Sequence, residues 1–98
     1  MRLEMKGNEL IITGNIKSVE DSVKIKETIS SMMAQGVKNV QMRIMDSLLL
    51  TSTAIGFLTK LIHQDELKVS IAVGDPRLYL LLEELHLLKK FNVRMLDA

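Results

Sequence analysis

The sequence lacks several features on which whole classes of protein function depend. It has no cysteine, so no disulfide can form and no thiolate is available for catalysis or metal binding. Its five glycines are scattered, and they form no GxGxxG or P-loop pattern that could hold phosphate groups. Two Phe, one Tyr and no Trp leave few rings that could stack on nucleic-acid bases. These absences argue against thiol chemistry, phosphate-binding loops and nucleic-acid recognition.

Charge and hydropathy restrict the class of protein further. The 13 basic and 12 acidic residues give a formal net charge of +1, which provides no general attraction to nucleic acid or to an anionic membrane. No apolar run reaches the roughly 20 residues that a membrane-spanning helix needs. The first residues, MRLEMKGNELIITG, alternate polar and apolar side chains and contain no apolar signal-peptide core. We therefore expect one cytoplasmic domain, residues 1–98, with no direct insertion into a membrane.

The spacing of apolar residues predicts an α/β domain. A hairpin comes first, and strands and helices then alternate, which favours right-handed parallel crossovers and a mixed sheet covered by helices. The predicted order is β-β-α-β-α-β-α-β. The segments are a hairpin over 3–14, helices that begin near residues 18, 51 and 76, and strands within 37–45, 67–73 and 91–97.

Local signals mark the ends of these helices. Ser18 followed by Asp21 resembles a capping box, and Gly36 is a natural residue to end the first helix. Asp75 suits the cap of the third helix, and Pro76 suits its first position because a proline there leaves no N–H unpaired.

Apolar stripes predict the side chains of the core. In the third helix, Leu80 projects away from the stripe and so faces solvent. The predicted inward-facing residues are Ile25, Ile29, Met32, Met33, Val40, Met42, Ile44, Ile55, Leu58, Leu61, Ile62, Leu78, Leu81, Leu82, Leu85 and Met95.

Residues that could carry catalysis or bind a metal are sparse. His63 and His86 fall on different predicted helices, and neither has a second ligand three or four positions away. Asp46–Ser47 has no general base near it in the sequence and is read as a solvated turn. Lys89–Lys90 would complement the dipole at the end of the third helix and does not predict a nucleic-acid site. We therefore predict no enzyme activity, no metal site and no cofactor.

Thr51, Ser52 and Thr53 place three hydroxyl side chains directly before an apolar helical stretch. The simplest interpretation is that Ser52 is the N-cap of the second helix, a role whose loss costs about 1 kcal/mol.

The segment TSTAIGFL also resembles the D-S-S-G-L-G motif of STAS domains, the family of sulphate-transporter and anti-sigma factor antagonist domains. Ile55-Gly56 match the L-G pair, Ala54 stands at the first glycine, Ser52-Thr53 stand at the two serines, and Thr51 replaces the aspartate. Asp46–Ser47 offers a competing D-S pair, but no pair of small residues follows it.

The resemblance extends over nearly the whole chain. LKVSIAVGDPRLYLLLEELHLLKKFNV is similar to the family's strand, SPxVxxxL helix and GLxxxF ending. Leu87 and Phe91 match the last two fixed positions of that pattern, and His86 replaces its glycine. The predicted order of elements also agrees with the STAS fold.

This resemblance implies a regulatory module that binds proteins. In anti-sigma factor antagonists, a partner serine kinase phosphorylates the first serine of the motif, and this abolishes binding to that kinase. The matching acceptor here is Ser52, with Thr53 as second choice. The implied partners are a serine kinase acting as an anti-sigma factor and a phosphatase, in bacterial signal transduction. The implied partner surface consists of Thr51, Ser52, Thr53, Ala54, Ile55, Gly56 and Phe57.

Two alternative functions of STAS domains remain open at this point. One is an adaptor subunit of a membrane transport complex, which docks permanently through a helical face and needs no switch. The other is a STAS domain that binds a nucleotide or a lipid without catalysis.

Overall fold

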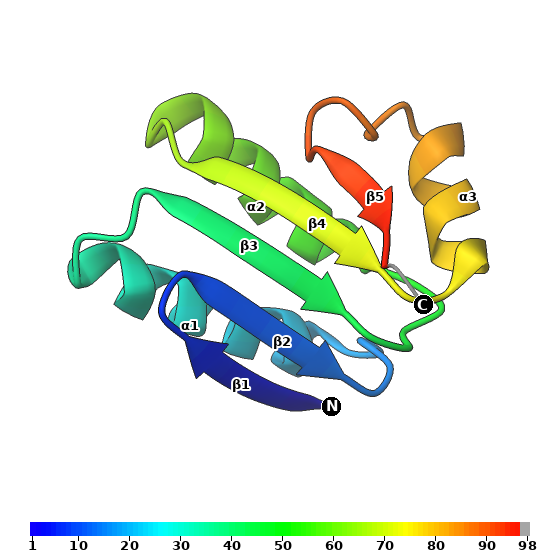
Figure 1. The fold of residues 1–98 in the computed structure, drawn as a ribbon, viewed down its shortest axis with the longest axis horizontal. Helices are drawn as coiled ribbons and strands as arrows, with labels where there is room; N and C mark the ends of the chain where they lie inside the picture. Colours follow the sequence, from blue (N-terminus) through cyan, green and yellow to red (C-terminus); the bar gives the residue numbers. More distant parts are fainter. Residues whose placement is uncertain (97–98) are drawn as a thin grey trace.

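The structure is a computed structural model of the chain, and it describes residues 1–96. Within these residues, five strands and three helices follow the order β-β-α-β-α-β-α-β (Figure 1), which confirms the prediction from the sequence. Their bounds are β1 Arg2–Lys6, β2 Glu9–Thr13, α1 Val19–Ala34, β3 Asn39–Ile44, α2 Ser52–Gln64, β4 Lys68–Val73, α3 Pro76–Glu84 and β5 Val93–Met95.

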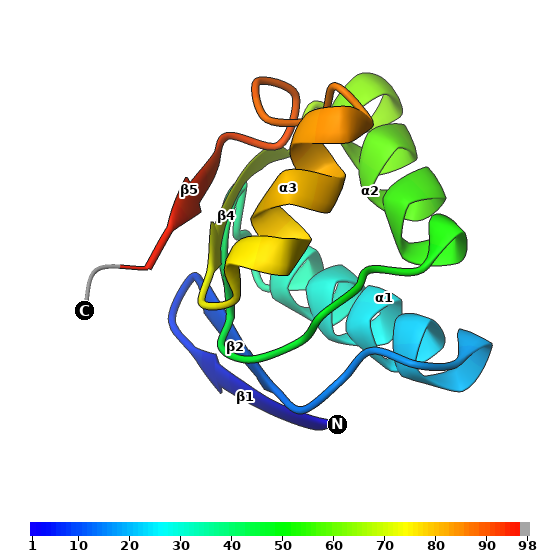
Figure 2. The same cartoon turned by 90° about the vertical axis from the view of Figure 1, so that its right-hand side faces the viewer.

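The strands form one sheet in the order β1-β2-β3-β4-β5. β1 and β2 are antiparallel, and every later pair of neighbours is parallel. Each crossover after the hairpin is right-handed and steps to the next strand in the same direction, so the helices must fall on the same face of the sheet. Figure 2 shows α1, α2 and α3 together on one side, with the other face of the sheet left open.

Alternation along the strands gives this sheet one apolar and one polar face. Val40, Met42 and Ile44 of β3 are buried beneath the helices, whereas Gln41 and Arg43 between them point to the open face. The same alternation continues in register on the neighbouring strands. The buried strand residues on the helix side also include Leu10, Ile12, Val69, Ile71 and Val73.

The helices complete the core with the stripes that the sequence predicts. Burial of their apolar side chains against the sheet supplies the main driving force for folding, about 25 cal/mol for each Å² removed from water. The fully buried helix residues are Ile25, Ile29 and Met32 of α1, Ala54 and Leu58 of α2, and Leu78 and Leu82 of α3.

The helix starts at α1 and α3 are also as predicted. Ser18 Oγ accepts a hydrogen bond from the Asp21 N–H at 3.1 Å, and the Asp21 carboxylate accepts from the N–H groups of Lys17 and Ser18. Asp75 caps α3, and Pro76 occupies its first position. The backbone N–H of Lys17 lowers the pKa of Asp21, and Arg77 lowers the pKa of Asp75 through hydrogen bonds from its side chain and backbone. Both carboxylates are therefore charged at neutral pH.

The end of α3 differs from the prediction. The helix stops at Glu84, so Lys89–Lys90 lies in the following turns and does not complement the dipole of its last turn. Leu85 is the C-cap residue and is 47% exposed, so its predicted place in the core is wrong. His86 directly after it has φ of +58°, a left-handed conformation that cannot continue a right-handed helix.

Met95 was also expected in the core, and it is 37% exposed. It closes β5, a strand of three residues that pairs only with β4 and forms the edge of the sheet. It alternates with Arg94 as expected, but as the last residue of this short edge strand it stays open to solvent.

Among the residues that the structure describes, no helix combines the length and the apolar character that crossing a membrane would require.

Two glycines have opposite roles, and they give a test of the packing. A Cβ on Gly74 would overlap the Met45 carbonyl oxygen, so Gly74→Ala should lower the free energy of unfolding by roughly 2 kcal/mol or more. A Cβ on Gly56, within α2, meets no atom within 4 Å, so Gly56→Ala should raise that energy by about 0.5–1 kcal/mol. Urea denaturation of both variants measures the difference. An unchanged or raised free energy of unfolding for Gly74→Ala would contradict the close approach of Gly74 to Met45, and a lowered one for Gly56→Ala would contradict the open space at Gly56.

Candidate functional site

The hydroxyl run lies at the first turn of α2, at the carboxyl end of the parallel strands. Thr51 is the N-cap: its backbone is extended (φ −69°, ψ 153°), and its Oγ1 accepts a hydrogen bond from the Ala54 N–H at 3.1 Å. Ser52 is the first residue inside the helix. The expectation that Ser52 caps α2 is therefore wrong, because a capping residue must keep a non-helical backbone.

Thr51 also joins α2 to α1 through Ser22, which is fully buried. Thr51 Oγ1 and Ser22 Oγ form a short hydrogen bond, and Ser22 Oγ donates to the Ser18 carbonyl oxygen at 3.3 Å. Each hydroxyl has one hydrogen, so the Ser22 donation requires that Thr51 donates to Ser22. A directed chain thus runs from the Ala54 N–H through Thr51 and Ser22 to Ser18, the cap of α1.

Ser22 is the important residue that the STAS-like motif does not include. It lies on the same helical stripe as Ile25, Ile29 and Met32, so its burial follows from periodicity. A buried hydroxyl requires a hydrogen-bond partner, but the sequence does not say which residue supplies it. Only the packing of α1 against α2 places Thr51 there.

The remaining residues of the 51–57 segment divide between core and surface. Ala54 is fully buried, so it supports this surface from below. Ile55 and Phe57 are partly buried against the core, whereas Ser52, Thr53 and Gly56 are exposed. The outward surface at the start of α2 is therefore made of two hydroxyl side chains and a bare stretch of backbone at Gly56.

The loop before α2 is fixed to the loop before α1 by hydrogen bonds. Asp46 Oδ1 accepts from the Gly14 N–H at 2.7 Å. Ser47 is fully buried, and its Oγ accepts from the Ile16 N–H at 3.1 Å and donates to the Leu49 carbonyl oxygen at 2.7 Å. These contacts show that Asp46 and Ser47 hold the two loops together, which gives them a structural role.

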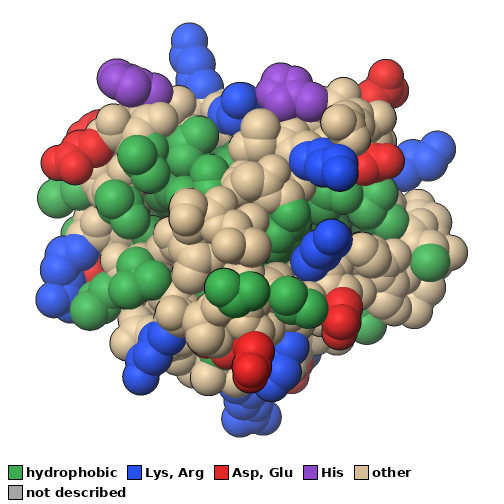
Figure 3. Space-filling view, turned by 180° about the vertical axis from the view of Figure 1, so that it is seen from behind, with side chains coloured by type: hydrophobic (Ala, Val, Ile, Leu, Met, Phe, Trp, Pro, Cys, Tyr) green, Lys and Arg blue, Asp and Glu red, His purple; other side chains and the backbone are tan. Residues whose placement is uncertain are grey.

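The loop before α2 and the start of α1 expose apolar side chains that the motif does not include. Leu48 and Leu49 are 37% and 39% exposed just before the α2 cap. Val19 and Val23, one turn apart in α1, are 63% and 42% exposed on either side of Ser22 in the sequence. Figure 3 views the helix-bearing face and shows hydrophobic side chains in several separate patches among polar ones.

The residues considered for metal binding do not come together. His63 lies in the last turn of α2 and His86 beyond the end of α3, and both are exposed. Within residues 1–96, no group of three His, Cys, Asp or Glu side chains could hold a metal ion.

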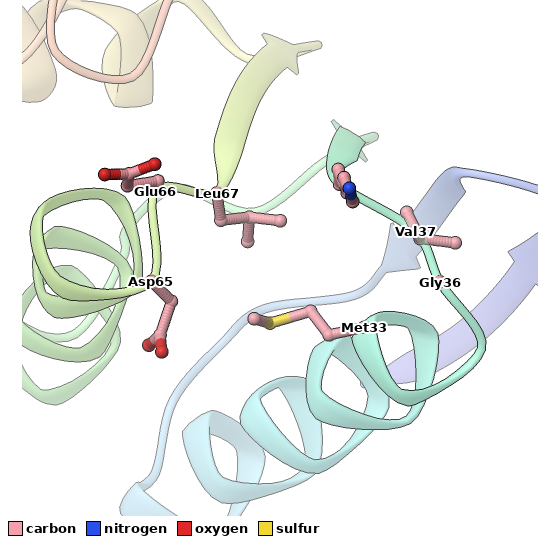
Figure 4. Close-up of a pocket in the computed structure, with 7 residues that line it drawn as sticks. Met33, Gly36, Val37, Asp65, Glu66 and Leu67 are labelled. Atoms are coloured by element: carbon pink, nitrogen blue, oxygen red, sulfur yellow. The ribbon is translucent and has the colours of Figure 1, made fainter.

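A cavity of about 340 Å³ lies at the opposite end of α2 from the hydroxyl run. It is bordered by the ends of α1 and α2, and Figure 4 shows Met33 on one side of it and Asp65 on the other. Asp65 and Glu66 are exposed, and among the described residues the lining includes no histidine or hydroxyl side chain. The described lining therefore offers no hydroxyl or imidazole group for catalysis.

Comparison with known proteins identifies the fold. No protein-family model matches the sequence, and no curated protein matches it either. The structure is similar to the crystal structure of an anti-sigma factor antagonist from Mycobacterium paratuberculosis, with a TM-score of 0.68 over 94% of this chain and 81% of that chain. Sequence identity is 12%, so the similarity shows the fold alone. The predicted STAS-like fold is thereby confirmed.

The hydroxyl chain predicts a clear ranking of two neighbouring substitutions. Thr51→Val removes the hydroxyl that accepts from the Ala54 N–H and bonds to Ser22. It should lower the free energy of unfolding by about 1–2 kcal/mol. Ser52→Ala leaves every hydrogen bond of the chain in place and should change it by at most about 0.5 kcal/mol.

Urea denaturation measures both energies, and Ser22→Ala completes a double-mutant cycle with Thr51→Val. We expect a coupling of at least about 0.5 kcal/mol between these two positions. A larger cost for Ser52→Ala than for Thr51→Val, or strictly additive effects at positions 22 and 51, would contradict this arrangement.

Proposed function

We propose that this chain, a STAS-like domain with the fold of an anti-sigma factor antagonist, is a non-catalytic regulatory module that binds a protein partner through the start of α2. The observation that carries the proposal is the position of Ser52. It is exposed at the first position of the helix, and it matches the first serine of the family motif.

Phosphorylation of Ser52 is the proposed switch, with Thr53 as the second acceptor. A kinase can reach both hydroxyls because both residues are exposed. Thr51 is partly buried, and its hydroxyl is occupied by Ala54 and Ser22. Because Thr51 is the cap, a phosphate on Ser52 leaves the cap and the hydroxyl chain intact.

The electrostatics of α2 favour such a phosphate. The first turn of α2 contains no acidic residue, whereas the first turn of α1 has Glu20 and Asp21. A phosphate adds about −1.5 to −2 charges beside the free N–H groups and the positive end of the helix dipole. The expected stabilisation is about 0.3–1 kcal/mol at an exposed site. The fold should therefore tolerate the modification.

The partner would meet the new charge directly. A surface that packs against Ser52, Thr53 and Gly56 must exclude water there, and burying a phosphate without a matching cation is costly. Leu48 and Leu49 extend the proposed contact surface with apolar area. The partner in this proposal is a serine kinase that acts as an anti-sigma factor, opposed by a phosphatase, in the cytoplasm.

The switch is tested with Ser52→Asp and Ser52→Ala. We expect Ser52→Asp to weaken binding to the purified partner by at least about tenfold, while Ser52→Ala keeps the affinity of the unmodified protein. Calorimetry measures the affinities, and circular dichroism checks that both variants are folded. Equal affinities of the two variants would rule out the switch.

The location of the surface is tested with Gly56→Leu, with Gly56→Ala as its matched control. The added isobutyl group projects into open space, so the domain should stay folded, but a closely packed partner would collide with it. We expect a loss of affinity of about tenfold or more for Gly56→Leu and a smaller loss for Gly56→Ala.

Unchanged affinity of folded Gly56→Leu would place the partner elsewhere. Loss of binding with Gly56→Leu together with equal affinities of Ser52→Asp and Ser52→Ala would instead favour a permanently docked adaptor.

A further inference from the structure

The face of the sheet opposite the helices is uncovered, and its composition is distinctive. No helix lies in front of it in Figure 1, and in Figure 2 all three helices lie on the other side. The strand register aligns Ile11, Arg43, Ala72 and Arg94 in one row across β2, β3, β4 and β5. Gln41 and Ser70 are paired in the next row.

Positive charge is concentrated on the half of this face formed by β3, β4 and β5, which we call the basic sheet face. It carries Arg43, Lys68 and Arg94, and within residues 1–96 these three strands contain no acidic residue at all. The nearest acid in the register is Glu9 on β2, whose Oε1 lies 3.6 Å from Arg43 Nη1. The side chain of Arg43 nevertheless remains 42% exposed.

The charge of the whole face contrasts with that of the rest of the molecule. Its strands present five of the 13 basic residues of the chain and two of the 12 acidic ones. The rest of the chain therefore carries eight basic and ten acidic residues. The net charge of +1 therefore conceals a positive sheet face and a negative remainder. The five bases of the face are Arg2, Lys6, Arg43, Lys68 and Arg94, and the two acids are Glu4 and Glu9.

We propose that the basic sheet face is a second docking surface and that its occupant is an acidic protein surface. Arg43 and Arg94 lie on either side of Ala72 in the register, and Ala72 itself is only 1% exposed, so the two arginine side chains form the outer surface of this row. Guanidinium groups bind carboxylates through paired hydrogen bonds. Gln41 and Ser70 add neutral groups that donate and accept hydrogen bonds beside these charges.

Other classes of occupant fit this face less well. The three aromatic residues, Phe57, Tyr79 and Phe91, all lie outside the strands, so no ring is available there to stack on a nucleic-acid base. Within residues 1–96, Ile11 is the only large apolar residue that the strands place on this face, and it is partly buried. Without apolar anchors, three net charges alone give roughly millimolar or weaker membrane binding. An acidic protein surface uses the groups that are present.

This surface is independent of the start of α2, because the sheet separates the two. A partner on the basic sheet face and a partner at Ser52 could bind at the same time, and the module would then bring them together. Strand register and charge define this surface, and phosphorylation of Ser52 plays no part in it.

The probe for the test is poly-L-glutamate, whose only charged groups along the chain are side-chain carboxylates. Binding of the labelled polymer is measured by fluorescence anisotropy, and the contact is mapped by amide chemical shifts of the ¹⁵N-labelled protein. The test variant combines Arg43→Gln, Lys68→Gln and Arg94→Gln. Its matched control combines Lys24→Gln, Lys26→Gln and Lys60→Gln on the exposed faces of α1 and α2, with the same change in net charge.

We expect the sheet variant to lose about tenfold in affinity while the control changes much less. The shifted amides should lie in β3, β4 and β5, and Ser52→Asp should leave the affinity unchanged. Equal losses in the two variants, or shifts confined to the helices, would overturn the proposal. Tighter binding to anionic phosphatidylserine vesicles or to single-stranded DNA than to poly-L-glutamate would overturn the choice of occupant.

Discussion

The constraint on which the structure depends is the hand and direction of its three parallel crossovers. The connection from β2 through α1 to β3 is right-handed, and it is repeated twice in the same direction across the sheet. All three helices must therefore lie on the same face of the sheet. The same repetition brings the loops before α1, α2 and α3 to one end of the sheet. It therefore creates both proposed surfaces: the start of α2 among the loops, and the polar face of the sheet that no helix covers.

On the helix-covered face of the sheet, the hydrogen-bonded chain from Ala54 through Thr51 and Ser22 to Ser18 joins the start of α2 to the start of α1. Thr51 can cap its own helix and also donate to Ser22, because a hydroxyl both donates and accepts. The aspartate of the family motif could accept from both groups and would add a negative charge. With Thr51 in its place, the first turn of α2 has no negative charge of its own. A phosphate on Ser52 would therefore be the first anion at this helix terminus.

A second departure from the motif shows how backbone shape can persist without the residue that favours it. His86 stands at the glycine of the family's closing pattern, and its φ of +58° is in the left-handed region. A residue with a Cβ pays about 1–2 kcal/mol for this conformation. Leu87 and Phe91 follow it, and the N–H of Leu87 donates to the Leu82 carbonyl oxygen at 2.9 Å. Burial of Phe91 and this hydrogen bond offset the strain and hold the turn in place.

The sequence by itself determined the order of the elements, the buried side of β3 and the caps at Ser18 and Asp75. These follow from interactions between residues that are close in the chain, such as the alternation of Val40, Met42 and Ile44 or the reach of Asp21 back to Ser18. Tertiary structure decided which hydroxyl caps α2, where α3 ends, and which side chains bond across helices. Thr51 and Ser22 are 29 positions apart, and no local pattern encodes their contact. The charge of the open face was likewise hidden, because Arg43, Lys68 and Arg94 become neighbours only when β3, β4 and β5 pair in register.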